Sequence, residues 1–132
     1  MSDTNRNEAA DTPETATRIS DDMLIILPVR NLVLFPGTVL PVAINRERSL
    51  AGAQEAVRNE RKVGFLLQHD PETQEPTGED LHKVGTVANI VRYVTAQDGS
   101  HHLVVQGERR FRVLDLQEGF PFMLARVEYL YE

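Results

Sequence analysis

Serine, histidine and acidic side chains are the groups in this 132-residue chain that could carry out chemistry. Ser2 and Ser20 lie in a polar N-terminal stretch, Ser49 at the start of an expected helix and Ser100 in an expected hairpin. None is an evident nucleophile paired with a general base, and the chain has no cysteine. The Gly-x-x-x-x-Gly-Lys-Ser/Thr run that holds a nucleoside triphosphate is also missing. We therefore expect no catalytic residue and no cofactor site in this segment.

Histidines and carboxylates could instead bind a metal ion. His101 and His102 are neighbours in an expected strand, so their side chains point to opposite faces of the sheet. Neither has a histidine partner at helical spacing. The acids between His69 and Asp80 lack the fixed spacing of a calcium-binding loop. We expect a solvated loop there and no metal site.

Arg109, Arg110 and Arg112 form the basic cluster that an RNA-binding protein would need. Alternation along a strand places Arg109 on one face and the other two on the opposite face, with Glu108 beside them. The whole chain carries a net charge of -6, and residues 23–132 hold 14 acids and 12 bases. A protein that neutralises many phosphates carries a basic excess instead. Nucleic acid is thus a disfavoured partner, and we expect the arginines to be paired or buried.

The N-terminal stretch differs in composition from the rest of the chain. Residues 1–22 are rich in Thr, Asp, Asn, Glu and Ala, and too polar to form a core, so we predict a disordered leader followed by one domain over residues 23–132. No apolar run is long enough to cross a membrane, and no signal peptide is present. Together with the lack of cysteine, these features predict a cytoplasmic protein.

The elements are expected to be short. Leu24–Ile44 is the most apolar stretch, but prolines and Gly37 divide it into pieces that suit strands and tight corners. We expect Pro28 and Pro41 at strand starts or edges, and Phe35-Pro36-Gly37 to form a type II turn.

Further along the chain, we expect a helix over about 46–60, capped by Asn45 or Ser49, with Leu50, Ala53, Ala56 and Val57 on its buried face. Later strands are expected over Val63–Leu67, Lys83–Thr95, His101–Gln106, Arg109–Leu116 and Met123–Tyr131, with a hairpin at Asp98-Gly99 and a bulge or corner at Gly107. The predicted fold is mainly β with one α-helix, in a small, partly open antiparallel β-barrel.

One stretch carries more apolar surface than a half-exposed strand requires. Both alternating faces of the run from Leu32 to Pro36 are apolar. Burial of the strand on both faces would explain this pattern. The functional alternative is an exposed patch for unfolded chains or a neighbouring subunit, for which we select Leu32, Leu34, Phe35, Pro36 and Val39 as binding residues.

Three blocks, in this order along the chain, carry a resemblance to a known family. The first block runs from Leu27-Pro28-Val29-Arg30-Asn31 through Phe35-Pro36-Gly37 and Leu40-Pro41-Val42 to Arg46-Glu47-Arg48-Ser49-Leu50. The second is Asp80-Leu81-His82-Lys83-Val84-Gly85-Thr86-Val87-Ala88, and the third is Gly107 followed by Arg110-Phe111-Arg112-Val113. Together these blocks resemble the N-terminal domain of Lon, the ATP-dependent protease family, although many relatives carry bulkier residues at the positions of Gly37 and Thr38. The resemblance covers about residues 24–131.

The resemblance implies a PUA-like fold and a non-catalytic role in substrate recognition and assembly. The parent would be a homohexameric AAA+ serine protease that degrades misfolded and regulatory proteins, with ATP and magnesium bound in its other domains. Two alternatives stay open. One is a stand-alone Lon-N-like adaptor that binds proteins, and the other is a PUA-like RNA-binding module.

Overall fold

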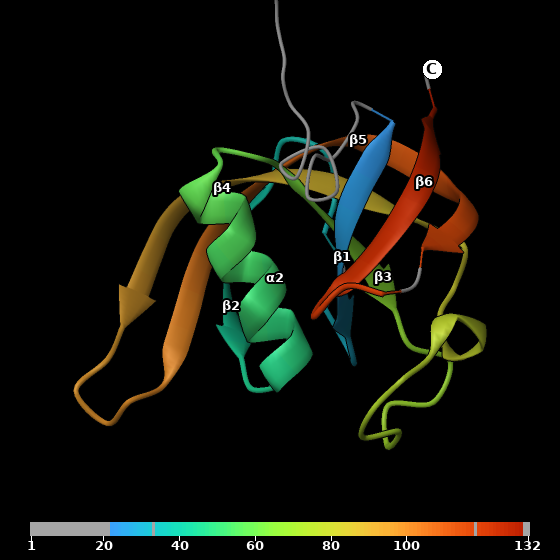
Figure 1. Cartoon of the computed structure of the whole chain (residues 1–132). Coiled ribbons are helices and arrows are strands. Elements are labelled where there is room, and N and C mark those ends of the chain that lie inside the picture. Colours follow the sequence, from blue (N-terminus) through green and yellow to red (C-terminus); the bar gives the residue numbers. More distant parts are fainter. Residues whose placement is uncertain (1–21, 33, 118, 131–132) are drawn as a thin grey trace, which may run out of the picture.

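The computed structural model describes residues 22–32, 34–117 and 119–130. Its elements are the strands β1 (Met23–Val29), β2 (Val39–Ile44), β3 (Val63–Leu67), β4 (Val84–Thr95), β5 (His101–Gln117) and β6 (Met123–Tyr129), the helix α2 (Glu47–Arg58) and a short 3-10 helix (Gly78–Asp80). Figure 1 shows α2 beside the strands and the 3-10 helix in the long connection between β3 and β4. The predicted leader lies outside the described residues, apart from Asp22.

Five of the strands form a closed ring. The sheet order is β2-β5-β4-β3-β1-β6, and β6 also pairs with β5, so that β2 is left at an edge. The mainly β fold with one helix is confirmed, but the sheet is not wholly antiparallel, because β1 and β3 run parallel. The connection between them contains β2 and α2, which gives it the length that a parallel crossover needs.

Strand β1 is buried on both of its faces. Leu24 and Ile26 point into a cluster inside the ring, which receives side chains from all five ring strands. Ile25 and Leu27 point the other way, into a second cluster that lies beneath α2 and β2. This double burial explains the continuous apolar run at the start of the domain.

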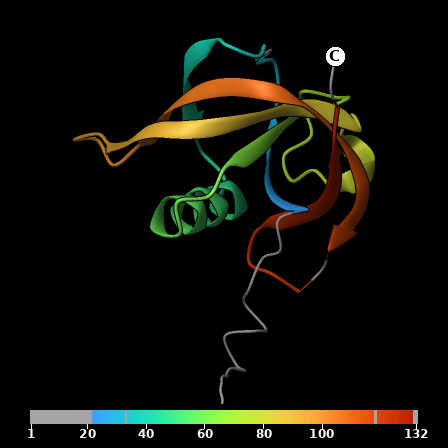
Figure 2. The same ribbon diagram turned by 90° about the horizontal axis from the view of Figure 1, so that it is seen from above.

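The long strands β4 and β5 take part in both halves of the molecule. Their hairpin extends well beyond the ring, as Figure 2 shows, and Gly99 at its tip adopts φ +87° as the Asp-Gly signal predicted. The two predicted strands on either side of Gly107 form one strand, β5, whose register with β4 shifts between Gly107 and Arg109. Of the two predicted alternatives at Gly107, the structure has the bulge and not the corner, and pairing continues through it.

The helix differs from its prediction in two details. Its N-cap is Arg46, which makes no capping hydrogen bond with its side chain, whereas Ser49 lies inside the helix and is buried. The buried face consists of Ser49, Gly52, Ala53 and Ala56, while Val57 is 43% exposed. The buried face of α2 is therefore rotated toward Gly52 relative to the predicted face. The reason is that the backbone at Gly52 packs against β1, where a Cβ would lie 2.8 Å from Cγ2 of Ile25.

Candidate protein-binding surface

Residues 35–38 form the tight turn that Pro36 and Gly37 predicted. The backbone N–H of Thr38 donates a hydrogen bond of 3.0 Å to the carbonyl of Phe35, and Gly37 has φ +87°. Proline at the first central position and a glycine with positive φ at the second are the features of a type II turn. The turn places Phe35 and Pro36 at the surface.

The turn is fixed to the sheet by backbone contacts with Gly107 of β5. The Gly37 N–H donates a hydrogen bond of 2.7 Å to the Gly107 carbonyl, and the Gly107 N–H donates one of 2.8 Å to the Thr38 carbonyl. The approach is so close that a Cβ on Gly107 would lie 2.4 Å from the carbonyl oxygen of Phe35. Any residue other than glycine would force this segment away from β5.

The structure separates the five predicted binding residues into two groups. Phe35, Pro36 and Val39 are exposed, the side chains of Phe35 and Val39 by 53% and 54%. Leu34 is buried in the cluster beneath α2, and Leu32 is half-buried against the same cluster. Binding by these residues stays a prediction, and the exposed three are the ones that a partner could reach directly.

The described residues between Leu32 and Pro36 do not form a strand buried on both faces. They lie in an irregular segment and a turn. The segment contacts Thr86 of β4 and Gly107 of β5, with Leu34 buried in the core and Phe35 exposed to solvent. The apolar pattern thus arises because Leu34, which anchors the segment in the core, is followed by the exposed residues Phe35 and Pro36.

Val39 also begins the outer face of the three-stranded sheet β2-β5-β4, a mixed face on which Gln106 pairs with Val39 and Arg92 with Val104. Residues that pair directly across antiparallel strands share a face, and the register aligns Pro41 with Val104, and Ala43 with His102 and Val94. Among their alternate neighbours, Val42, Ile44, Leu103 and Val105 are buried in the cluster beneath α2, and Leu40 and Tyr93 are half-buried against it. We define the outer face by its exposed or half-buried apolar members Val39, Pro41, Ala43, Val104 and Val94.

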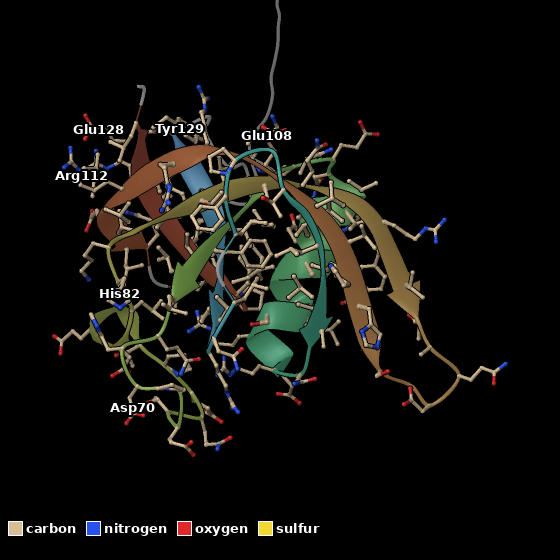
Figure 3. The ribbon with its side chains drawn as sticks, turned by 180° about the vertical axis from the view of Figure 1, so that it is seen from behind. Asp70, His82, Glu108, Arg112, Glu128 and Tyr129 are labelled. Atoms are coloured by element: carbon tan, nitrogen blue, oxygen red, sulfur yellow. The ribbon has the colours of Figure 1, made fainter. Side chains whose placement is uncertain are left out.

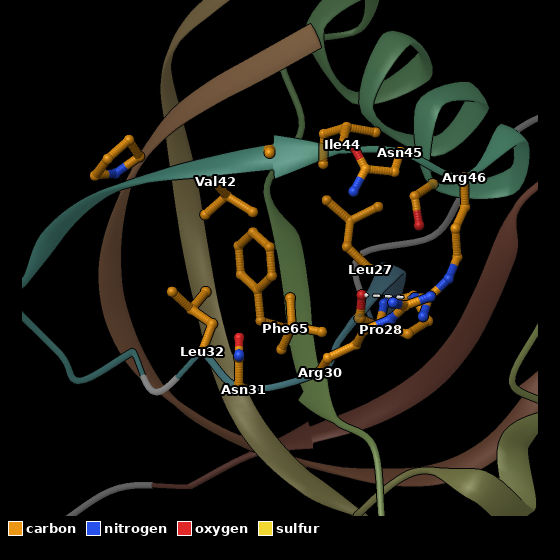
Figure 4. Close-up of a pocket in the computed structure, with 14 residues that line it drawn as sticks. Leu27, Pro28, Arg30, Asn31, Leu32, Val42, Ile44, Asn45, Arg46 and Phe65 are labelled. Atoms are coloured by element: carbon orange, nitrogen blue, oxygen red, sulfur yellow. Dashed lines mark hydrogen bonds between the residues drawn. The ribbon is translucent and has the colours of Figure 1, made fainter. Parts of the chain in front are cut away.

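A pocket lies at the free edge of β2, on the side away from β5. It encloses about 330 Å³ between residues 41–46 and residues 27–32, with Phe65 also contributing to its lining. Figure 4 shows Leu32, Val42 and Phe65 around the pocket, with Arg46 reaching along one side to the carbonyl of Pro28. Pro41 in this edge strand agrees with its predicted position, because proline has no N–H to donate.

Arg46 holds the long β3–β4 connection against the pocket. Its Nε donates a hydrogen bond of 2.9 Å to the carbonyl of Gln74, and its Nη2 donates to Oε1 of Gln68. Gln68 is buried and in turn donates from Nε2 to the carbonyls of Asp70 and Thr73. Burial and then the charge of Arg30 lower the pKa of the Arg46 guanidinium below its ordinary value. Arg46 is therefore the centre of a polar network that orders the connection.

The basic cluster is engaged in contacts within the protein. The guanidinium of Arg109 lies 4.2 Å from the ring centroid of Tyr129, and that of Arg110 lies 5.8 Å from the ring centroid of Phe35. Arg112 forms an ion pair of 2.8 Å with Glu128, and Figure 3 shows these two side chains together. These contacts agree with the expectation of paired arginines.

The remaining candidate groups make local contacts. Ser100 bonds to Asp98 and His102 at the hairpin tip, and His101 bonds to Tyr93. Within the described residues, no group of three or more histidine, cysteine or acidic side chains could hold a metal ion. None of the helices in the described part of the chain is long and apolar enough to span a membrane.

Sequence reasoning missed several surface residues that the fold brings together. Val39, Pro41 and Ala43 are alternate residues of β2. Because alternate residues of a strand share a face, the sequence could have predicted that Pro41 and Ala43 lie on the same face as Val39. Val104 and Val94 join them only through strand pairing, which a single sequence does not reveal. Arg30 and Arg46 were part of the quoted sequence blocks, but nothing local indicated that they share a pocket.

The family comparison identifies a match over most of the chain. Residues 23–132 match the model of the ATP-dependent protease La (LON) substrate-binding domain. The chain is 48% identical over 125 residues to a Lon protease of Paraburkholderia phytofirmans, and 50% identical over 111 residues to one of Methylocella silvestris. These matches cover 94% and 84% of this chain, but only 16% and 14% of those relatives.

Solved structures support the fold. The chain is similar to a Lon N-terminal domain protein from Xanthomonas campestris, with a TM-score of 0.65 and 22% identity over 83% of this chain and 60% of that one. It is also similar to the N-terminal domain of a Mycobacterium avium complex Lon protease, with a TM-score of 0.61 and 20% identity over 83% and 55% of the two chains. At these identities the likeness concerns the fold alone.

Proposed function

The chain belongs to the LON substrate-binding domain family, and from this premise we propose that it recognises unfolded or misfolded polypeptides for a Lon-type ATP-dependent protease. The chain spans about one sixth of the length of the curated relatives it matches. Proteolysis would therefore be the work of other domains, which would bind ATP and magnesium. The segment itself would be non-catalytic, in a homohexameric, cytoplasmic parent protein that also degrades regulatory proteins.

The observation that carries this proposal is the exposed apolar surface of Phe35, Pro36 and the outer face. Unfolded chains expose apolar side chains and unpaired backbone groups, which folded proteins bury. Phe35 and Val39 are about half exposed although they are large and apolar. β2 also pairs with β5 alone, so its other edge is free within the described sheet. A surface of this kind can bind many polypeptides with little sequence preference.

The proposal is tested by binding of a reduced, carboxymethylated protein that cannot refold. Immobilised wild-type chain should retain it, and the double variant F35S/V39S should retain several-fold less. Leu114→Ser is the matched control, because Leu114 is 47% exposed but lies outside the outer face. Equal retention by the double variant and wild type would contradict the proposed surface.

Crosslinking locates the contact independently. A photoreactive unfolded client should label residues 35–39 and the outer face, and mass spectrometry would map the labelled peptides. Labels confined to other parts of the chain would contradict the assignment. The purified chain should hydrolyse neither ATP nor peptide, and activity in the pure protein would contradict a non-catalytic role.

A stand-alone adaptor is a second candidate, since the surface itself does not require attached catalytic domains. The reading frame beyond Glu132 distinguishes the two candidates. RNA binding is less well supported, because Arg112 is paired with Glu128 and Arg109 lies over the ring of Tyr129. Salt-sensitive retention of RNA by the purified chain would favour that alternative.

A further inference from the structure

The pocket at the free edge of β2 has an apolar lining and a cationic side. Leu27, Leu32, Val42, Ile44 and Phe65 supply most of the apolar part. Arg30 and Arg46 are its charged residues, and none of the aspartates and glutamates that the structure describes lines it, although the whole chain carries a net charge of -6. The pocket therefore concentrates positive charge in an acidic protein.

The two arginines lie near each other, and both contact Gln74. Nη2 of Arg30 lies 3.4 Å from Oε1 of Gln74, while Nε of Arg46 donates to the carbonyl of the same residue. Burial and then the charge of Arg30 lower the pKa of Arg46, and the second effect is expected of neighbouring cations. Among the described residues, no carboxylate forms an ion pair with either one. Glu47 and Glu75 line a neighbouring hollow that shares Arg46, and they too are unpaired with it.

Arg46 has a structural role, but it retains binding capacity. Its bonds go to neutral acceptors, namely the carbonyls of Pro28, Thr73 and Gln74 and the amide oxygen of Gln68. These bonds hold the guanidinium in place and leave its charge unneutralised. Arg30 is exposed, with the single long contact to Gln74. An anion could therefore be bound by Arg30 beside the fixed charge of Arg46.

The size and shape of the pocket restrict the ligand. A volume of about 330 Å³ is at the lower end of the range for ligand sites, so it admits one or two residues and no larger folded element. An apolar lining beside a cationic side suits a ligand with an apolar body and one carboxylate. The last residue of a polypeptide combines both, whereas an N-terminus would bring a positive charge toward the arginines. The free edge of β2 lies along the pocket and is suited to an extended chain.

We propose that this pocket binds the C-terminal residue of a polypeptide substrate, with an apolar side chain between β2 and residues 27–32 and the α-carboxylate at Arg30 and Arg46. The inference rests on the proposed function, because it supposes that polypeptides are the ligands. It adds a second mode of recognition to the apolar surface: one selects exposed apolar segments, and the other selects the end of a chain.

The test compares two fluorescent peptides that differ only at the C-terminus. Both end in Ala-Leu-Phe, one as the free acid and one as the amide, and binding to the 132-residue chain is measured by anisotropy. The free acid should bind about tenfold more tightly, which is the effect expected of a charge-assisted hydrogen bond. Arg30→Gln should bring the acid down to the affinity of the amide, and Arg30→Lys should keep part of the preference.

The control is Arg126→Gln, because Arg126 is exposed on β6 and does not line the pocket. It should keep the full preference for the acid. Equal binding of acid and amide by wild type, no binding of either, or an unchanged preference in Arg30→Gln would each overturn the proposal. A peptide amide with an internal aspartate that binds as well as the free acid would also overturn it, by showing that any carboxylate suffices.

The same protein samples separate this inference from the proposed function. If the wild-type chain retains the carboxymethylated client through Phe35 and Val39 but does not distinguish acid from amide, only the pocket assignment fails. If it retains no client and yet prefers the free acid, the pocket assignment holds and the apolar surface is wrong. Loss of both would remove the proposed function together with the inference.

Discussion

The hydroxyl of Thr86 donates a hydrogen bond of 2.7 Å to the backbone carbonyl of Leu34. Both residues are buried, and the bond joins β4 to the irregular segment that precedes the turn at Pro36. With the backbone bonds to Gly107, it fixes the position from which Phe35 projects. The exposed aromatic ring is thus supported by buried polar contacts.

Thr86→Val should lower the free energy of unfolding by about 1–3 kcal/mol, because the Leu34 carbonyl would lose its partner while the shape of the side chain is retained. Urea unfolding followed by circular dichroism measures the change. Thr95→Val is the control, since Thr95 is exposed on the same strand. Equal loss in both variants would show that the buried bond has no special role.

Gly107→Ala should destabilise the chain and displace the turn. The added Cβ would lie 2.4 Å from the carbonyl oxygen of Phe35, and relieving such overpacking costs about 1–3 kcal/mol. Retention of the unfolded client should fall as well. Gln97→Ala, at an exposed position between β4 and β5 that is not part of the outer face, should change neither property. A Gly107→Ala variant with wild-type stability would contradict the close approach.

Arg46→Met should loosen the connection between β3 and β4. The carbonyl of Gln74 and the buried side chain of Gln68 would lose their donor. Hydrogen exchange at the Thr73 amide, which is bonded to Asp70 within this connection, should accelerate by about tenfold or more. Arg48→Met, at an exposed position of α2, should leave that exchange rate unchanged. An unaltered exchange rate at Thr73 in Arg46→Met would show that Arg46 does not hold the β3–β4 connection in place.

Ser100→Ala should raise the pKa of Asp98 toward its ordinary value. The Ser100 hydroxyl, 2.6 Å from Oδ1 of Asp98, and the Ser100 N–H hold that pKa low. Because the pKa is lowered on folding, these contacts stabilise the folded hairpin above the ordinary carboxyl pKa and are lost as the pH falls through the folded value. Carboxyl NMR titration of Asp98 measures the shift. Gln97→Ala should leave it in place, and an unmoved pKa in Ser100→Ala would contradict the assigned cause.

Local signals in the sequence predicted the local structure. Pro36-Gly37 and Asp98-Gly99 specify their turns because few residues other than glycine adopt the required positive φ. Val63–Leu67 is a short apolar run, and it forms β3 with those same bounds. The sequence did not predict the parallel pairing of β1 with β3 or the closure of the ring by β6. Both depend on contacts between residues far apart in sequence.

The candidate site was also predictable only where local sequence signals indicate it. An apolar excess around Phe35 indicated surface beyond the needs of the core, and Phe35 and Val39 are indeed exposed. The sequence could not indicate that Leu34 anchors the segment, because its carbonyl bonds to Thr86 from a distant strand. The charged pocket was likewise hidden, since Arg30 and Arg46 meet only through Gln74 of the β3–β4 connection.

The position of β6 has a consequence for biosynthesis. It is last of the six strands in sequence, yet it lies between β1 and β5 and closes the ring. During translation, one edge of β1 can pair with β3, but its other edge stays unpaired until Met123–Tyr129 has left the ribosome and formed β6. A nascent chain that stalls before this point exposes the unpaired edge of β1, which makes it the kind of incomplete polypeptide that chaperones bind.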